Sequence, residues 1–141
     1  MNSKEEVFVG IDLCYSEVQI HLFNTNGNCL DTFTIFNNFL SPGEFTVVLT
    51  KRITLIQHSY QINFITIFIP GVLDHEKRRV ESLQGIPSWS EVPLVDWLEI
   101  RLKTKVLLIR KTSISLRKDL SAYFLEIKSN YSDLCEQTVL L

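Results

Sequence analysis

Hydrophobic and polar positions along this chain switch several times between a two-residue and a helical period. Residues 7–13 form an apolar run that is typical of a buried strand. Residues 17–24 alternate, so one side of this strand is expected to face a core and the other to be exposed. The exposed side would carry Gln19, His21 and Phe23. The Asn-Gly pair that follows predicts a hairpin into a strand over 29–36, so three antiparallel strands are expected to open the chain.

Helical spacing begins after these strands. Ser41 and Pro42 are typical of a helix cap and of the first helical position, and the apolar spacing predicts a helix to about residue 59. That helix is long enough to return the chain for a parallel strand over 62–69, which Pro70-Gly71 would end. The remaining expected elements are a rim strand over 78–82, a helix over 91–103, a buried strand over 105–109 and a third helix over about 113–128.

The order of these elements is β-β-β-α-β-α-β-α. It predicts an α/β fold of the ribonuclease H-like (actin-like ATPase) type, as a single lobe. We expect a five-stranded mixed sheet, with strand order 3-2-1-4-5 and flanking helices. The whole chain, residues 1–141, is interpreted as one domain with its core over about 7–128 and a C-terminal tail over 129–141.

Composition indicates an ordinary globular protein, with 45% hydrophobic residues, 21% charged residues and a net charge of −2. Its three cysteines, Cys14, Cys29 and Cys135, are widely spaced, which favours reduced thiols in a cytoplasm. The first residues lack the apolar stretch of a signal peptide, and the most apolar later run is too short to span a bilayer. A soluble cytoplasmic protein without a membrane partner is expected.

Neither the basic residues nor the histidines predict a binding site for nucleic acid or metal. Residues 101–118 carry seven Lys or Arg and no acid, but no aromatic residue is interleaved for base stacking, so nucleic acid is not an expected partner. His21 and His58 are interpreted as surface positions and His75 as a loop residue. None has a carboxylate or cysteine at ligand spacing, and we therefore expect no metal and no cofactor.

Three stretches in order resemble the N-terminal lobe of the ROK family of sugar kinases and sugar-responsive repressors. The segment VFVGIDLCYSEVQIHLFNTNGNCL resembles the family's opening strand, its G-[IV]-D-x-G-G-T-K phosphate loop and the next two strands. The segment ITIFIPGVLD is similar to IGIGVPGPVD, and GIPSWSEVPLVDWLEIRLKTKVLL is similar to NLPGWxxVPLxxxLExxLGxPVxV. The resemblance covers about residues 7–115, the first part of a family member.

The phosphate-loop positions depart from the family pattern. The resemblance implies that Asp12 holds a magnesium-bound water, although a structural role in the following turn is the alternative. The two glycines of the motif are replaced by Cys14 and Tyr15, its Thr by Ser16 and its Lys by Glu17. Glycines let backbone N–H groups approach phosphate, whereas a bulky ring and an added anion oppose it. The loop is therefore expected to be degenerate.

The sugar-site positions depart as well. The family's sugar-contacting Asn falls on Gly85, and its catalytic Asp falls on Lys111, next to Arg110. A lysine is protonated at neutral pH and does not serve as a simple base, although this pair could still bind an anion. The family's second lobe and its His-and-Cys zinc motif have no counterpart in the sequence. No residue of the chain is therefore expected to be catalytic.

These departures favour a non-catalytic interaction or regulatory module, an inactive kinase fragment or pseudoenzyme. We expect a homodimer, or a protein partner that covers the surface of the missing lobe, with the third helix or the tail at the interface. One alternative is a ribonuclease H-like, metal-dependent nuclease or transposase-type domain. Its carboxylates would come from Asp12, Asp74, Asp96 and Asp119. The other alternative is one half of a split sugar kinase.

Overall fold

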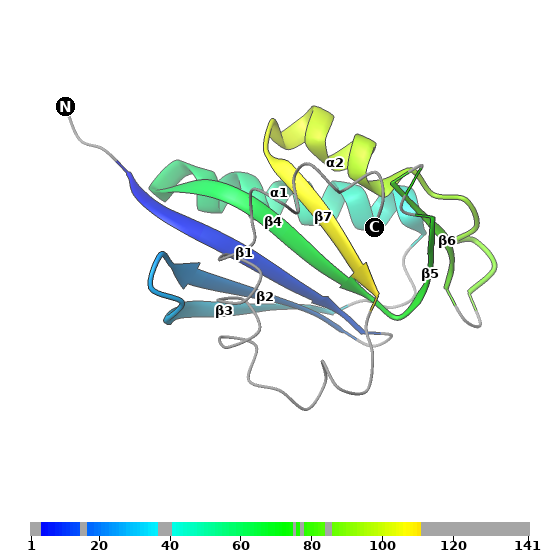
Figure 1. The fold of residues 1–141 in the computed structure, drawn as a ribbon, viewed down its shortest axis with the longest axis horizontal. Coiled ribbons are helices and arrows are strands. Elements are labelled where there is room, and N and C mark those ends of the chain that lie inside the picture. Colours follow the sequence, from blue (N-terminus) through cyan, green and yellow to red (C-terminus); the bar gives the residue numbers. More distant parts are fainter. Residues whose placement is uncertain are drawn as a thin grey trace.

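The computed structural model describes residues 4–14, 17–36, 41–74, 76, 78–83 and 86–110. The third helix expected over 113–128 and the tail over 129–141 lie outside the described residues. The elements of the fold, drawn in Figure 1, are β1 (Glu5–Leu13), β2 (Glu17–Asn24), β3 (Cys29–Phe36), α1 (Pro42–Ser59), β4 (Tyr60–Ile69), β5 (Gly71–Asp74), β6 (Arg79–Leu83), α2 (Leu94–Leu102) and β7 (Lys105–Arg110).

Five strands form one mixed sheet in the order β3-β2-β1-β4-β7. β1 lies at its centre, antiparallel to β2 and parallel to β4, and Val9 pairs with Leu22 on one side and Ile65 on the other. β3 is antiparallel to β2, and β7 is parallel to β4. The predicted α/β fold, mixed sheet and strand order 3-2-1-4-5 are confirmed, with β7 as the fifth strand.

A two-stranded hairpin of β5 and β6 follows β4. The sequence predicted the rim strand but not β5, because Pro70-Gly71 was interpreted only as the end of β4. In the structure Gly71 begins β5, close against its partner strand. A Cβ atom at Gly71 would lie 2.2 Å from the carbonyl oxygen of Ser82, so glycine is required there by close approach of the two backbones.

The helix starts follow local chemistry. Ser41 caps α1, its hydroxyl accepting a hydrogen bond of 3.3 Å from the backbone N–H of Glu44, as predicted. α2 begins at Leu94 and not at residue 91, because Val92 exchanges two backbone hydrogen bonds of 2.8 Å with Val80 of β6. Among the described residues, no helix is both long and apolar enough to cross a membrane.

The two faces of the sheet differ in their cover. Both α1 and α2 lie on one side (Figure 1), which we call the first face, and their apolar side chains share one cluster with Val9, Ile11 and Ile65. The opposite side, the second face, carries a separate cluster of Phe8, Phe23, Phe64, Phe68 and Leu107. Phe23, expected to be exposed, is only 1% exposed. Its strand is buried on both sides at this point.

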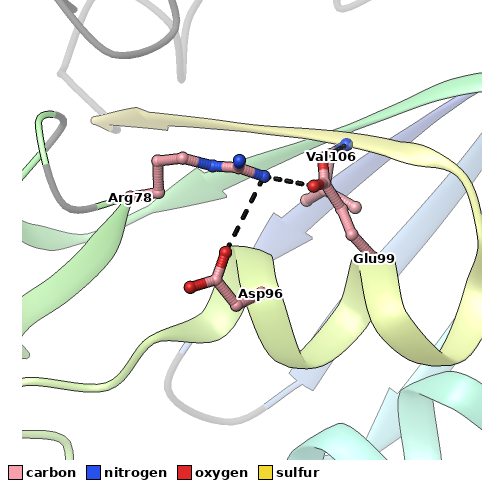
Figure 2. A network of polar contacts seen from close by, with 4 residues as sticks. All are labelled: Arg78, Asp96, Glu99 and Val106. Carbon is pink, nitrogen blue, oxygen red and sulfur yellow. Dashed lines mark hydrogen bonds and ion pairs between the residues drawn. The ribbon is translucent and has the colours of Figure 1, made fainter.

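A polar network joins the β5–β6 hairpin to the rest of the domain. Figure 2 shows the Arg78 guanidinium reaching toward the carboxylates of Glu99 and Asp96 on α2. A guanidinium nitrogen of Arg78 lies 4.0 Å from a carboxylate oxygen of Asp96. The other carboxylate oxygen of Glu99 accepts a hydrogen bond of 2.9 Å from the backbone N–H of Val106 on β7. Glu99 therefore connects three elements, and its side chain is only 23% exposed.

Candidate functional site

The carboxyl ends of the parallel strands β1, β4 and β7 meet at one edge of the sheet. Ligands of open α/β sheets bind at such an edge. Asp12 lies near the end of β1 and pairs with Phe68 of β4, while Arg110 ends β7 and pairs with Ile69 of β4. Two of the residues singled out from the sequence thus lie at the edge where a site is expected.

A backbone hydrogen bond joins the two ends of the turn after β1. The backbone N–H of Cys14 donates a hydrogen bond of 2.9 Å to the carbonyl oxygen of Glu17. Tyr15 and Ser16, between them, lie outside the described residues. In a phosphate loop, backbone N–H groups of this turn point at the ligand. Here the N–H of Cys14 is instead used to hold β1 and β2 together.

Two carboxylates share the second face next to this turn. Asp12 lies opposite Gln19, and Glu17 precedes Gln19 by two residues, so successive side chains place all three on one face. The Gln19 amide donates a hydrogen bond of 3.0 Å to the Glu17 carboxylate. Diagonal neighbours on paired strands lie about 7–8 Å apart. A phosphate entering here would meet the negative charges of both Asp12 and Glu17.

His21 also belongs to this face and is half-buried, not exposed as expected. Its Nδ1 atom lies 3.3 Å from the hydroxyl of Thr32. Burial lowers the pKa of His21 below its usual value, and the negative charge of Asp12 acts in the opposite direction. Gly10 of β1 pairs with His21 across the two strands.

The expected sugar-site residues do not assemble around Asp12. Gly85 and Lys111 lie outside the described residues. Arg110 is exposed, and alternation along β7 directs it to the first face, because it pairs with Ile69, whereas Asp12 is on the second face with Phe68. The two charged side chains therefore leave the sheet on opposite sides.

The carboxylates considered for a nuclease are also dispersed. Asp74 ends β5 in the hairpin, Asp96 on α2 is near Arg78, and Asp119 lies outside the described residues. Within the described ranges, no group of three His, Cys, Asp or Glu side chains could hold a metal ion.

A small hollow that the sequence did not indicate lies at the opposite end of the sheet, between α1 and the β2–β3 pair. Its volume is about 150 Å³. The Arg52 guanidinium carbon lies 5.6 Å from the centroid of the Phe33 ring, within the range of a cation–π contact. Asp31 and Tyr60 also line the hollow, which is distant along the strands from Asp12.

Solved structures of ROK-family proteins have the same arrangement. A ROK-family transcriptional regulator, homologous to the E. coli MLC protein, matches 77% of this chain with a TM-score of 0.64 and 17% identity. A ROK-family glucokinase from Streptomyces griseus, in complex with glucose and AMPPNP, matches 74% with a TM-score of 0.65 and 17% identity. A ROK-family protein from Streptococcus pneumoniae, in complex with sucrose, matches 83% with a TM-score of 0.66 and 15% identity.

These matches define how far the likeness extends. The aligned part is 28%, 33% and 38% of the length of those three chains, so this chain corresponds to about a third of each. No family model matches the sequence, and no curated protein matches it either. The predicted resemblance is confirmed as a likeness of fold: the chain has the fold of one lobe of the ROK-type, actin-like architecture.

Proposed function

We propose that this chain is a non-catalytic, ROK-like module that acts through protein interaction, with a degenerate phosphate loop. The observation that carries the proposal is the hydrogen bond between the two ends of the turn after β1, which the N–H of Cys14 donates to the carbonyl of Glu17. That N–H is not directed at a ligand. The Glu17 carboxylate on the same face as Asp12 adds repulsion toward any phosphate.

A protein partner is the interaction that this proposal assigns to the module. This chain corresponds to about a third of each ROK-like neighbour, and the surface that the rest of such a chain would cover is the proposed place for a partner. A second copy is the commonest solution for such a surface, so the proposed assembly is a homodimer. Its location would be the cytoplasm, which the wide spacing of the three cysteines along the sequence favours.

The test is calorimetric titration of the 141-residue chain with magnesium ATP and, separately, with glucose, each up to millimolar concentration. No heat of binding above dilution is expected for either. A Glu17→Lys variant, which removes the added anion, serves as the matched comparison. The proposal would be overturned if the natural chain bound the nucleotide with millimolar or tighter affinity and an Asp12→Ala variant did not. That result would favour the split-kinase alternative.

A separate calorimetric titration with Mn²⁺ distinguishes the module from a nuclease. Two-metal hydrolysis needs a carboxylate cluster that binds Mg²⁺ or Mn²⁺. The proposed module is expected to give no saturable heat with Mn²⁺. Saturable binding that is lost in Asp12→Ala would favour the nuclease alternative.

A further inference from the structure

β3 is an edge strand of the five-stranded sheet, and among the described residues no strand pairs with its outer side. An edge strand presents backbone N–H and C=O groups to which another chain can pair, and proteins commonly protect it with Lys, Pro or a short length. β3 has eight residues, CLDTFTIF, without Lys, Arg, Pro or Gly. The other edge strand, β7, has six residues and carries Lys105 and Arg110 at its ends. β3 is therefore the less protected edge.

The hydrogen-bond pattern between β1 and β2 determines which backbone groups of β3 point outward. In antiparallel strands, residue pairs that exchange two hydrogen bonds alternate with pairs that exchange none. The backbone bond between Cys14 and Glu17 fixes this alternation, so every second residue of β2 counted from Glu17 turns its N–H and C=O toward β1. The residues between them, such as Val18 and Ile20, therefore turn theirs toward β3.

The residues of β3 that receive these hydrogen bonds are Phe33 and Ile35, which pair with Ile20 and Val18. Alternation turns the backbone groups of their neighbours to the outer side: Thr32, Thr34 and Phe36. The N–H of Thr32 agrees with this assignment, because it donates a hydrogen bond of 2.8 Å to the side-chain carboxylate of Asp31. The outer edge of β3 is thus formed by the backbone of alternate residues.

The sequence of β3 is complementary to itself when two copies pair antiparallel about Phe33. In this register Thr32 of one copy lies opposite Thr34 of the other, and the two Phe33 rings lie opposite each other. Thr–Thr and aromatic pairs are among the favourable cross-strand pairs. At both ends, Phe36 of one copy lies near Leu30 of the other. Both side chains are exposed in the single chain, Phe36 to 74% and Leu30 to 40%, so pairing would cover them.

We propose that two copies of this chain pair along the outer edges of β3, antiparallel about Phe33, and join their five-stranded sheets into one continuous sheet. The inference rests on the proposed homodimer and names the strand that forms its interface. The edge adjoins the surface assigned to a partner, because Phe36 pairs with Glu17 beside the turn after β1. Pairing consumes the β3 edge of each copy, so the assembly closes at two.

One side chain of β3 opposes this pairing. The Asp31 carboxylate accepts from the N–H of Thr32, which in the dimer would donate to the carbonyl oxygen of Thr34 in the second copy. The second copy must displace this carboxylate before that bond can form. Removal of the carboxylate is therefore expected to strengthen the dimer, whereas removal of an outward N–H is expected to weaken it.

Amide hydrogen exchange of the natural chain, at low micromolar and at submillimolar concentration, tests the edge directly. The N–H of Thr34 is expected to exchange about tenfold or more slowly at the higher concentration, because it then bonds to the carbonyl oxygen of Thr32 in the second copy. The N–H of Ile35 bonds to β2 and should be protected at both concentrations.

Two results of this measurement would overturn the proposal. Equal protection of Thr34 at both concentrations would show that another segment of the same chain covers the edge. No protection at either concentration would show that nothing covers it. A chain that sediments as a dimer while Thr34 stays unprotected would remove this interface and leave the homodimer of the proposed function in place.

Three variants give an independent readout in sedimentation equilibrium. Thr34→Pro lacks the outward N–H, which an edge strand tolerates, and is expected to be folded by circular dichroism and monomeric. Thr34→Val keeps that N–H and is the matched control, expected to remain dimeric. Asp31→Ala is expected to lower the dimer dissociation constant several-fold. A folded, dimeric Thr34→Pro chain would contradict the proposal, and so would an Asp31→Ala chain that dimerises more weakly than the natural one.

Discussion

The imidazole of His21 lies half-buried on the second face, with the Thr32 hydroxyl 3.3 Å from Nδ1. Burial lowers its pKa in the folded chain, more than the charge of Asp12 raises it. The unfolded chain, in which His21 has an ordinary pKa near 6.5, therefore binds more protons as the pH falls through that value. The neutral imidazole stabilises the fold above this pH, and the stabilisation is lost below it.

This sign predicts a specific pH dependence. Between pH 7.5 and 5.5, the free energy of unfolding is expected to fall more in the natural chain than in His21→Gln, because glutamine takes up no proton. Urea denaturation at the two pH values measures the difference. His58→Gln, at an exposed position of α1, is the control and should retain the natural slope. An identical slope in His21→Gln would contradict the role of burial.

For the residues of β2, the sequence correctly predicted which side chains are buried on the first face, but not that Phe23 is buried on the second. Alternation correctly assigned Val18, Ile20 and Leu22 to a buried side. It could not show that Phe23 is buried on the opposite side, because a period of two indicates only that the sides differ. The burial of Phe23 depends on Phe8 of the neighbouring β1 and on Phe64 of β4, a strand distant in the sequence.

Among the elements, the β5–β6 hairpin depends on one carboxylate. Glu99 accepts from the backbone N–H of Val106 and pairs with Arg78, so it fixes the hairpin against α2 and β7. Asp96 approaches the same guanidinium but its side chain is 56% exposed. The exposed pair is screened by water and contributes little, whereas loss of Glu99 leaves a partly buried N–H without its acceptor.

Replacement of Glu99 is therefore expected to lower the free energy of unfolding more than replacement of Asp96. Glu99→Ala should lower the free energy of unfolding by about 1–3 kcal/mol, and Asp96→Ala by less than about 0.5 kcal/mol. Urea unfolding at neutral pH measures both. Equal losses would show that the network of Figure 2 is not centred on Glu99.

The main elements followed from local signals, and the hairpin did not. The Ser41 cap and the helical spacing after it gave α1 its start and end at Pro42 and Ser59. β5 was missed because a strand of four residues beginning with glycine has no period of its own. It exists because Ser82 and its neighbours in β6 pair with it. The late start of α2 has the same cause, since Val92 is held by Val80.

For the whole molecule, we propose a homodimer and expect the C-terminal tail, residues 129–141, to take part in its interface. Sedimentation equilibrium should give about twice the chain mass of 16.3 kDa. Leu140→Glu in the tail is expected to reduce it to the mass of one chain, and Thr138→Glu, a nearby polar position, is the control. A monomer at high concentration would remove the homodimer and leave only a different protein as partner.

The central strand β1 pairs with β2 on one side and with β4 on the other. These two strands lie at different places in the sequence, so they are synthesised at different times. β2 follows after a short turn, whereas β4 begins only at Tyr60, after α1. At about 5–20 residues per second, the first three strands leave the ribosome several seconds before β4 is available. During this interval the rings of Phe64 and Phe68, which complete the aromatic cluster in the folded chain, are not yet available. The nascent chain therefore exposes an aromatic surface before β4 is available, and we expect it to be prone to aggregation during this interval.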